Sequence, residues 1–115
     1  MIDGAHIIIH STDPEADRAF FRDFLRFPNI DVGHGWLIFA LPPSEVAVHP
    51  AEENGRHEFY LMCDDVHALV EMLRAAQIAA SHIQEENWGW LTYVTLPAGG
   101  RLGIYQPKHA RPTAL

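Results

Sequence analysis

The chain of 115 residues is poor in several features that would point to common protein classes. A single cysteine, Cys63, means that no disulfide can form within the chain. Lys and Arg number 8 against 15 Asp and Glu, and the net charge of −7 argues against binding to a nucleic-acid backbone. No apolar run approaches the ~18 residues of a membrane span, and no basic stretch followed by an apolar one opens the sequence. We therefore expect a cytoplasmic protein that binds neither nucleic acid nor membrane.

Two frequent catalytic signatures are missing as well. The sequence contains no G-x-S-x-G nucleophile elbow and no glycine-rich phosphate loop. Cys63 stands in an apolar, strand-like run, which favours a buried small hydrophobe over a nucleophile. The composition, with 48% hydrophobic and 20% charged residues, is that of an ordinary folded protein. Nucleophilic catalysis therefore finds no support in the sequence.

The sequence repeats itself at about half its length. Segment 35–42 (GWLIFALP) returns as segment 89–97 (GWLTYVTLP), and a linker-like stretch, 50–55 (PAEENG), lies between the two. A unit of ~50 residues buries too little surface to be stable alone. We therefore expect one domain over residues 1–115, built from two similar units at about 5–49 and 57–106.

Each unit shows the same order of local signals. An apolar, β-branched run comes first, and His6 and Glu58 each stand in such a run, seven residues before an acidic helix start. Thr12 or Asp13 is suited to cap the first helix, and Asp64 or Asp65 the second. Three strand-like segments follow each helix. The expected fold is α+β, with two β-α-β-β-β units at the strand and helix positions 5–10, 14–27, 30–32, 36–41 and 45–49, then 57–63, 66–76, 81–85, 89–96 and 101–106.

Three segments resemble motifs of one superfamily. Segment 20–27 (FFRDFLRF) is similar to F-Y-x-x-x-L-G-F, segment 63–66 (CDDV) to V-D-D-I, and segment 97–107 (PAGGRLGIYQP) to P-D-G-N-x-I-E-L-x-x-P. Together they resemble the vicinal oxygen chelate superfamily, which includes glyoxalase I, extradiol dioxygenases and bleomycin-resistance proteins. Arg26 and Gln77 stand where the family has glycine, so a left-handed helix end is not assured at these positions.

The resemblance implies curved mixed sheets that form a cup-shaped cleft. Metal-dependent members place ligands on the first and last strands of each unit. On this sequence the first-strand positions fall on His6 and Glu58, and the last-strand positions, where the family has Glu, fall on Ala47 and Gly103. A shift of one residue would put His57 in place of Glu58. Since neither Ala47 nor Gly103 can bind a metal, we expect additional space at the floor of the cup.

Strand alternation extends this set, because side chains two residues apart point to the same face. Residues in phase with the family positions are expected to line the cup: His10, His49, Tyr60, Met62 and Tyr105. His10 and His49 are equally compatible with polar residues that find partners near strand ends. Trp36 and Trp90 are expected to pack in the core or between units.

Two functions follow from these expectations. We favour a small-molecule-binding protein of the glyoxalase, bleomycin-resistance and dioxygenase type, without a metal cofactor, that takes aromatic or cationic ligands and forms a homodimer. The alternative is a lyase, isomerase or dioxygenase dependent on a divalent metal (Zn, Ni, Mn or Fe), with His6 and Glu58 as ligands.

Overall fold

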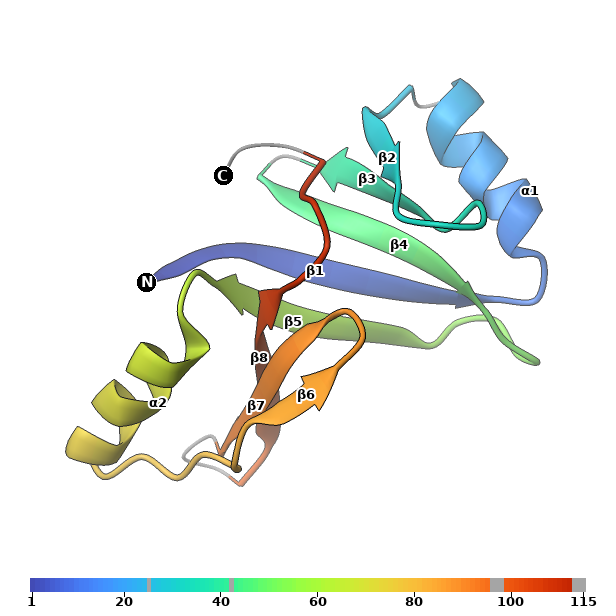
Figure 1. Ribbon diagram of the computed structural model, residues 1–115. Helices are drawn as coiled ribbons and strands as arrows, with labels where there is room; N and C mark the ends of the chain where they lie inside the picture. The colour runs from blue at the N-terminus through green and yellow to red at the C-terminus, as the bar shows by residue number, and fades with distance from the viewer. Residues whose placement is uncertain (25, 42, 96–98, 113–115) are drawn as a thin grey trace. The chain divides into compact units, whose positions relative to one another are not determined.

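The computed structural model describes residues 1–24, 26–41, 43–95 and 99–112, except for the side chain of Phe24. Leu25, Pro42 and residues 96–98, which belong to the sequence motifs above, lie outside the described residues. The chain divides into two compact units. The N-terminal unit comprises Ala5–Phe59 and the chain from Ala110 on, and the C-terminal unit comprises Tyr60–His109 with Met1–Gly4. Each unit combines several strands with one helical stretch, which confirms the α+β class (Figure 1).

In the N-terminal unit, four strands pair in the order β2-β3-β4-β1. Strands β1 and β4 are parallel, whereas β2 with β3 and β3 with β4 are antiparallel. The α-helix of this unit continues directly into a π-helical segment instead of running as one long helix to residue 27. The elements are β1 (Ile2–Ser11), α1 (Pro14–Ala19), η1 (Phe20–Phe24), β2 (Asn29–Asp31), β3 (Leu37–Leu41) and β4 (Ser44–Pro50).

In the C-terminal unit, the strands pair in the order β5-β8-β7-β6. Here β5 and β8 are parallel, and the other two pairs are antiparallel. The short strand β6 begins three residues later than predicted. The elements are β5 (His57–Cys63), α2 (Val66–Ala75), β6 (Gln84–Glu86), β7 (Gly89–Thr95) and β8 (Arg101–Pro107).

An aspartate caps the start of each helix. A carboxylate oxygen of Asp13 accepts a hydrogen bond from the Ala16 amide at 3.1 Å, and Asp65 accepts one from the Ala68 amide at 3.0 Å. These bonds satisfy backbone donors that have no partner within the first turn of a helix. Of the predicted alternatives, Asp13 and not Thr12 caps the first helix, and Asp65 and not Asp64 caps the second.

Both helical stretches end at a left-handed residue, which the sequence had not assured. Arg26 and Gln77 both have φ of 60°, so each adopts the left-handed conformation although neither is glycine. At Gln77 the turn is closed by the Ile78 amide, which donates to the Leu73 carbonyl at 2.9 Å, and by the Gln77 amide, which donates to Arg74. This is the bonding pattern of a Schellman helix end. The hydrogen bonds preserve the turn despite the unfavourable residue type.

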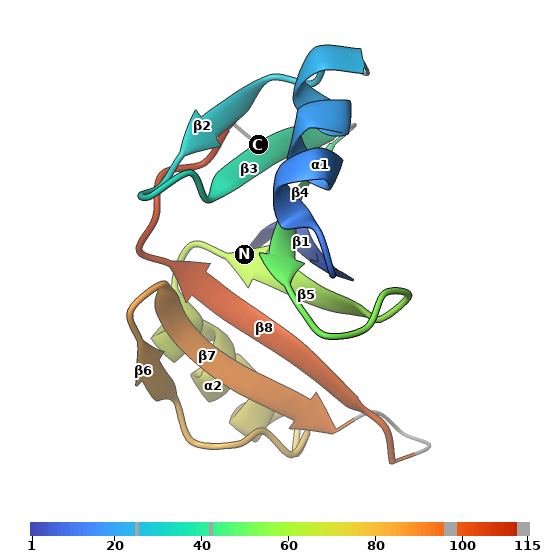
Figure 2. The same ribbon diagram turned by 90° about the vertical axis from the view of Figure 1, so that its right-hand side faces the viewer.

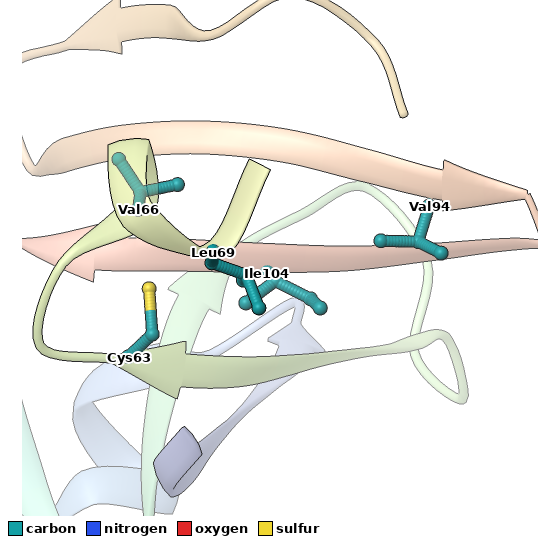
Figure 3. Close-up of a cluster of buried hydrophobic side chains, with 5 residues drawn as sticks. All are labelled: Cys63, Val66, Leu69, Val94 and Ile104. Atoms are coloured by element: carbon teal, nitrogen blue, oxygen red, sulfur yellow. The ribbon is translucent and has the colours of Figure 1, made fainter. Parts of the chain in front are cut away.

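The C-terminal unit buries a different set of side chains on each face of its sheet. On the face that α2 covers (Figure 2), strand and helix residues form one cluster (Figure 3): Cys63, Val66, Leu69, Val94 and Ile104. The opposite face carries Met62, Leu91 and Tyr105. Neighbours in the chain, such as Met62 and Cys63, thus point to opposite faces, as strand alternation requires. No helix in the described part of the chain is long and apolar enough to cross a membrane.

Candidate functional site

A row of polar side chains lies along the β1–β4 pair of the N-terminal unit. The parallel register places His6 opposite Glu45, and His10 opposite His49. Because side chains alternate along both strands, these four residues share one face with Ala47 between them. The sequence prediction that His6, His10, Ala47 and His49 point the same way agrees with this register.

Glu45 is the site residue that the sequence analysis missed. The family position on this strand was assigned to Ala47, but Ala47 lies opposite Ile8, and Glu45 lies opposite His6. The expectation that this strand offers no carboxylate to His6 is therefore wrong. Nδ1 of His6 is in hydrogen-bonding contact with a carboxylate oxygen of Glu45, and the two residues are only 6% and 0% exposed. Alternation from Ala47 would have identified Glu45, which is two residues away.

A second imidazole–carboxylate contact lies further along the same strand. Nε2 of His10 contacts a carboxylate oxygen of Glu58, at the start of β5. Glu58 is partly buried whereas His57 is exposed, so Glu58, and not its neighbour, faces His10. The ring of His49 meets that of His10 edge-on, with 6.3 Å between ring centroids. The N-terminal unit thus brings three imidazoles and two carboxylates together.

The surroundings of His49 strongly alter its ionisation. Burial lowers the pKa of its imidazole to about 4, and the neighbouring charges of His6, His10 and Arg18 act in the same direction. The carboxylate of Glu58 opposes the shift. His49 is therefore neutral at pH 7, and a neutral imidazole can accept a hydrogen bond or a proton, or bind a metal.

Trp36 borders this site and is not buried in a core, whereas the other predicted role, packing between the units, stays a prediction. Trp36 is 39% exposed, and its ring centroid lies 4.7 Å from that of His49. Close to His10, the loop of residues 51–56 borders a depression of about 510 Å³. The His10 amide donates to the Arg56 carbonyl at 3.0 Å, which ties this loop to β1. The row of polar side chains is thus bordered by the exposed ring of Trp36 at His49 and by the depression at His10.

The residues predicted in the C-terminal unit form a packed aromatic cluster. Tyr60 meets Tyr105 edge-on at 5.9 Å, and Met62 and Tyr105 are fully or almost fully buried. The Tyr105 hydroxyl lies 3.0 Å from Nε2 of His109. A Cβ atom at Gly103 would lie 2.5 Å from Cδ1 of Tyr60. The additional space that we expected at Gly103 is thus filled by the Tyr60 ring.

The donor set at His6 and Glu45 fits part of a divalent-metal site. An imidazole nitrogen and a carboxylate oxygen approach each other from the first and last strands of one unit. These are ligand types that Zn, Ni, Mn and Fe accept. Two ligands alone do not hold such an ion firmly, so the site would need further donors.

Comparisons with known proteins place the fold but not the function. Models of protein families and curated protein sequences give no match. Among solved structures, a glyoxalase/bleomycin resistance protein/dioxygenase superfamily member from Vibrio splendidus 12B01 has a TM-score of 0.54 and 16% identity, over 89% of this chain and 97% of its own. A variant of methylmalonyl-CoA epimerase from Streptomyces coelicolor, in complex with 2-nitronate-propionyl-CoA, has a TM-score of 0.61 and 16% identity, over 93% and 96% of the two chains.

A protein described as an NAD-dependent benzaldehyde dehydrogenase from Legionella pneumophila has a TM-score of 0.61 and 13% identity, over 90% of this chain and 99% of its own. These likenesses show that the chain has the vicinal oxygen chelate fold. Proteins described in such different terms share that fold, so the function must be argued from the site.

Proposed function

We propose that this chain binds a planar small molecule at the His-lined face of the N-terminal unit, without a resident metal. The observation that supports this proposal best is the exposed ring of Trp36 beside the neutral imidazole of His49. An aromatic wall with a few polar groups is typical of small-molecule sites. The net charge of −7 would favour cationic ligands through long-range attraction.

Fluorescence titration with proflavine, a planar aromatic cation, tests this proposal. We expect saturable binding that weakens by about tenfold in His49→Ala, which corresponds to ~1.4 kcal/mol. His82→Ala is the matched control, because His82 is exposed and lies in the other unit. Equal losses in both variants, or binding that does not saturate, would contradict a site at His49.

The contact between His6 and Glu45 supports a second candidate, a lyase, isomerase or dioxygenase that depends on a divalent metal. A metal bound there would supply Lewis-acid chemistry on neighbouring oxygens of a substrate. His6 and Glu45 would each contribute one ligand atom. His49, which is neutral at pH 7, is the group that could take up a proton from the substrate.

Metal analysis separates the two candidates. Protein purified without chelator should contain almost no Zn, Ni, Mn or Fe if the first candidate holds, and it should bind none on reconstitution. One metal per chain that is lost in Glu45→Gln, but kept in the control Glu86→Gln on exposed strand β6, would establish the second candidate instead.

We also propose that residues 1–115 fold as one domain and form a homodimer in the cytoplasm. The supporting argument is size, since units of ~50 residues bury too little surface to be stable alone. A single cooperative unfolding transition and a dimeric mass in sedimentation equilibrium are expected. A strict monomer at micromolar concentration would refute the dimer, and cell fractionation tests the location.

A further inference from the structure

We propose that Trp36 selects planar aromatic ligands at this site, and that Arg18 together with the turn at residues 33–35 positions its ring. This inference rests on the proposed small-molecule function and names the residue that would set its specificity. Neither Trp36 nor Arg18 belongs to the set predicted from the sequence. Three features surround Trp36: the turn that carries it, the buried cation of Arg18 and the imidazole of His49.

The turn before β3 has a constrained backbone. Gly33, His34 and Gly35 have φ of 131°, 55° and 80°, so three consecutive residues lie in the left-handed region. The Gly33 amide donates to a carboxylate oxygen of Asp31 at 2.8 Å, and the Trp36 amide donates to the Gly33 carbonyl at 3.0 Å. Such a conformation is costly for His34 and persists only where neighbouring contacts impose it. The turn therefore fixes the direction in which the Trp36 side chain leaves the backbone.

Arg18 supports the same ring from α1. It is only 5% exposed, although charged side chains are rarely buried so completely. Its Nε and Nη2 donate to the Val48 carbonyl at 3.2 and 2.7 Å, and its Cζ lies 5.4 Å from the centre of the Trp36 ring. Nη1 donates at 3.3 Å to Glu15, whose side chain is 81% exposed. Arg18 thus links helix α1 to the end of β4 and to the indole ring of Trp36.

The ring held in this way forms a wall beside His49. The rings of Trp36 and His49 are inclined by 58°, and their centroids lie 4.7 Å apart. Val48, whose carbonyl accepts hydrogen bonds from Arg18, directly precedes His49 in β4. Trp36 nevertheless remains 39% exposed. A large, rigid ring that is held by its neighbours and still partly exposed offers a stacking surface at little entropic cost. Flat aromatic ligands can stack on this surface with a whole face, whereas saturated, puckered ligands cannot.

The specificity is tested with two probes: proflavine, which is planar and aromatic, and decahydro-2-naphthol, a saturated bicyclic alcohol that cannot stack. Binding is followed through the imidazole proton shifts of His49 in NMR spectra. In Trp36→Leu we expect proflavine affinity to fall about tenfold and decahydro-2-naphthol affinity to stay within about twofold. An equal loss for both probes would overturn the role of Trp36 in selection.

The positioning role is tested with Arg18→Met, which keeps an unbranched apolar stem but removes the guanidinium. The matched control is Arg22→Met, since Arg22 is exposed and pairs with its neighbour Asp23. In Arg18→Met, the ring-current shift that Trp36 imposes on the His49 protons should shrink, and proflavine should weaken as in Trp36→Leu. Arg22→Met should change neither quantity.

The outcomes distinguish this inference from a purely structural role of Arg18. If Arg18→Met lowers stability but leaves the His49 shifts and the probe preference unchanged, Arg18 does not position the ring. Should Arg18→Met fail to fold, Arg18→Lys, which retains the charge without the forked geometry, provides the same two readouts. If the native protein binds neither probe, the proposed function fails, while the His49 shifts still report whether Arg18 holds Trp36.

Discussion

Replacement of Gly103 by alanine should destabilise the protein, because the space beside this glycine is filled. The added Cβ would lie 2.5 and 2.6 Å from two ring carbons of Tyr60 and 3.3 Å from Cε1 of Tyr93. Carbon atoms prefer separations of about 3.5–4.0 Å, so the Tyr60 ring would have to move by roughly 1 Å. Overpacking of this kind costs about 1–3 kcal/mol, and lower unfolded-state entropy offsets about 0.4–1 kcal/mol of it. A net loss of about 1–2 kcal/mol is expected.

A double-mutant cycle with Tyr60→Ala isolates the clash. Tyr60→Ala alone should lower the unfolding free energy by roughly 2–4 kcal/mol through lost packing. In that background Gly103→Ala should cost nothing, since the ring that obstructs the new methyl group is gone. Gly89→Ala is the control, because its Cβ would lie 2.5 Å from the backbone oxygen of Gln106, which cannot move aside. It should be destabilising with or without the Tyr60 ring.

Urea unfolding followed by circular dichroism and tryptophan fluorescence measures all of these variants. If the cost of Gly103→Ala persists after removal of the Tyr60 ring, a group other than Tyr60 causes the clash, which refutes the prediction. If Gly103→Ala leaves stability unchanged, the space beside Gly103 is open. The C-terminal unit would then offer the room for a ligand that the sequence suggested.

Three further predictions concern single groups. Burial lowers the pKa of His49 to about 4, so between pH 6.5 and 4 the unfolded chain binds a proton that the folded chain does not. As the pH falls through this window, the free energy of unfolding should decrease by about 1–2 kcal/mol more in the native protein than in His49→Asn, a figure reduced for partial solvent screening. Asp65→Ala should cost about 1 kcal/mol through loss of the helix cap, whereas Asp64→Ala should change the unfolding free energy by less than about 0.5 kcal/mol. Burial raises the pKa of the Cys63 thiol to about 11, so the folded protein should not react with Ellman's reagent at pH 8. The thiol should react only when urea unfolds the chain, and rapid reaction of the native protein would contradict this.

Local signals in the sequence determined the elements and, through them, the α+β class. Alternation of apolar residues along strands and an aspartate before each helix act over a few residues, so they can be recognised without the tertiary structure. The same alternation correctly grouped His6 with His10, and Ala47 with His49. At the helix ends, however, the residue types at Arg26 and Gln77 gave no reason to expect a left-handed turn. The backbone hydrogen bonds that close the turn at Gln77 involve residues of several types, so they leave no sequence signal.

The composition of the site was decided by the pairing of strands that lie far apart in the chain. Alternation within β4 shows which residues share a face, but only the register with β1 shows that His6 meets Glu45 and that Ala47 meets Ile8. Such a register depends on the packing of whole strands. A family motif aligned by sequence alone therefore cannot supply it. Likewise, glycine at position 103 and tryptophan at position 36 do not reveal their surroundings. Whether a small residue leaves a space, and whether a large one is buried, depends on the side chains that tertiary packing brings beside them: Tyr60 in one case, and Arg18 and His49 in the other.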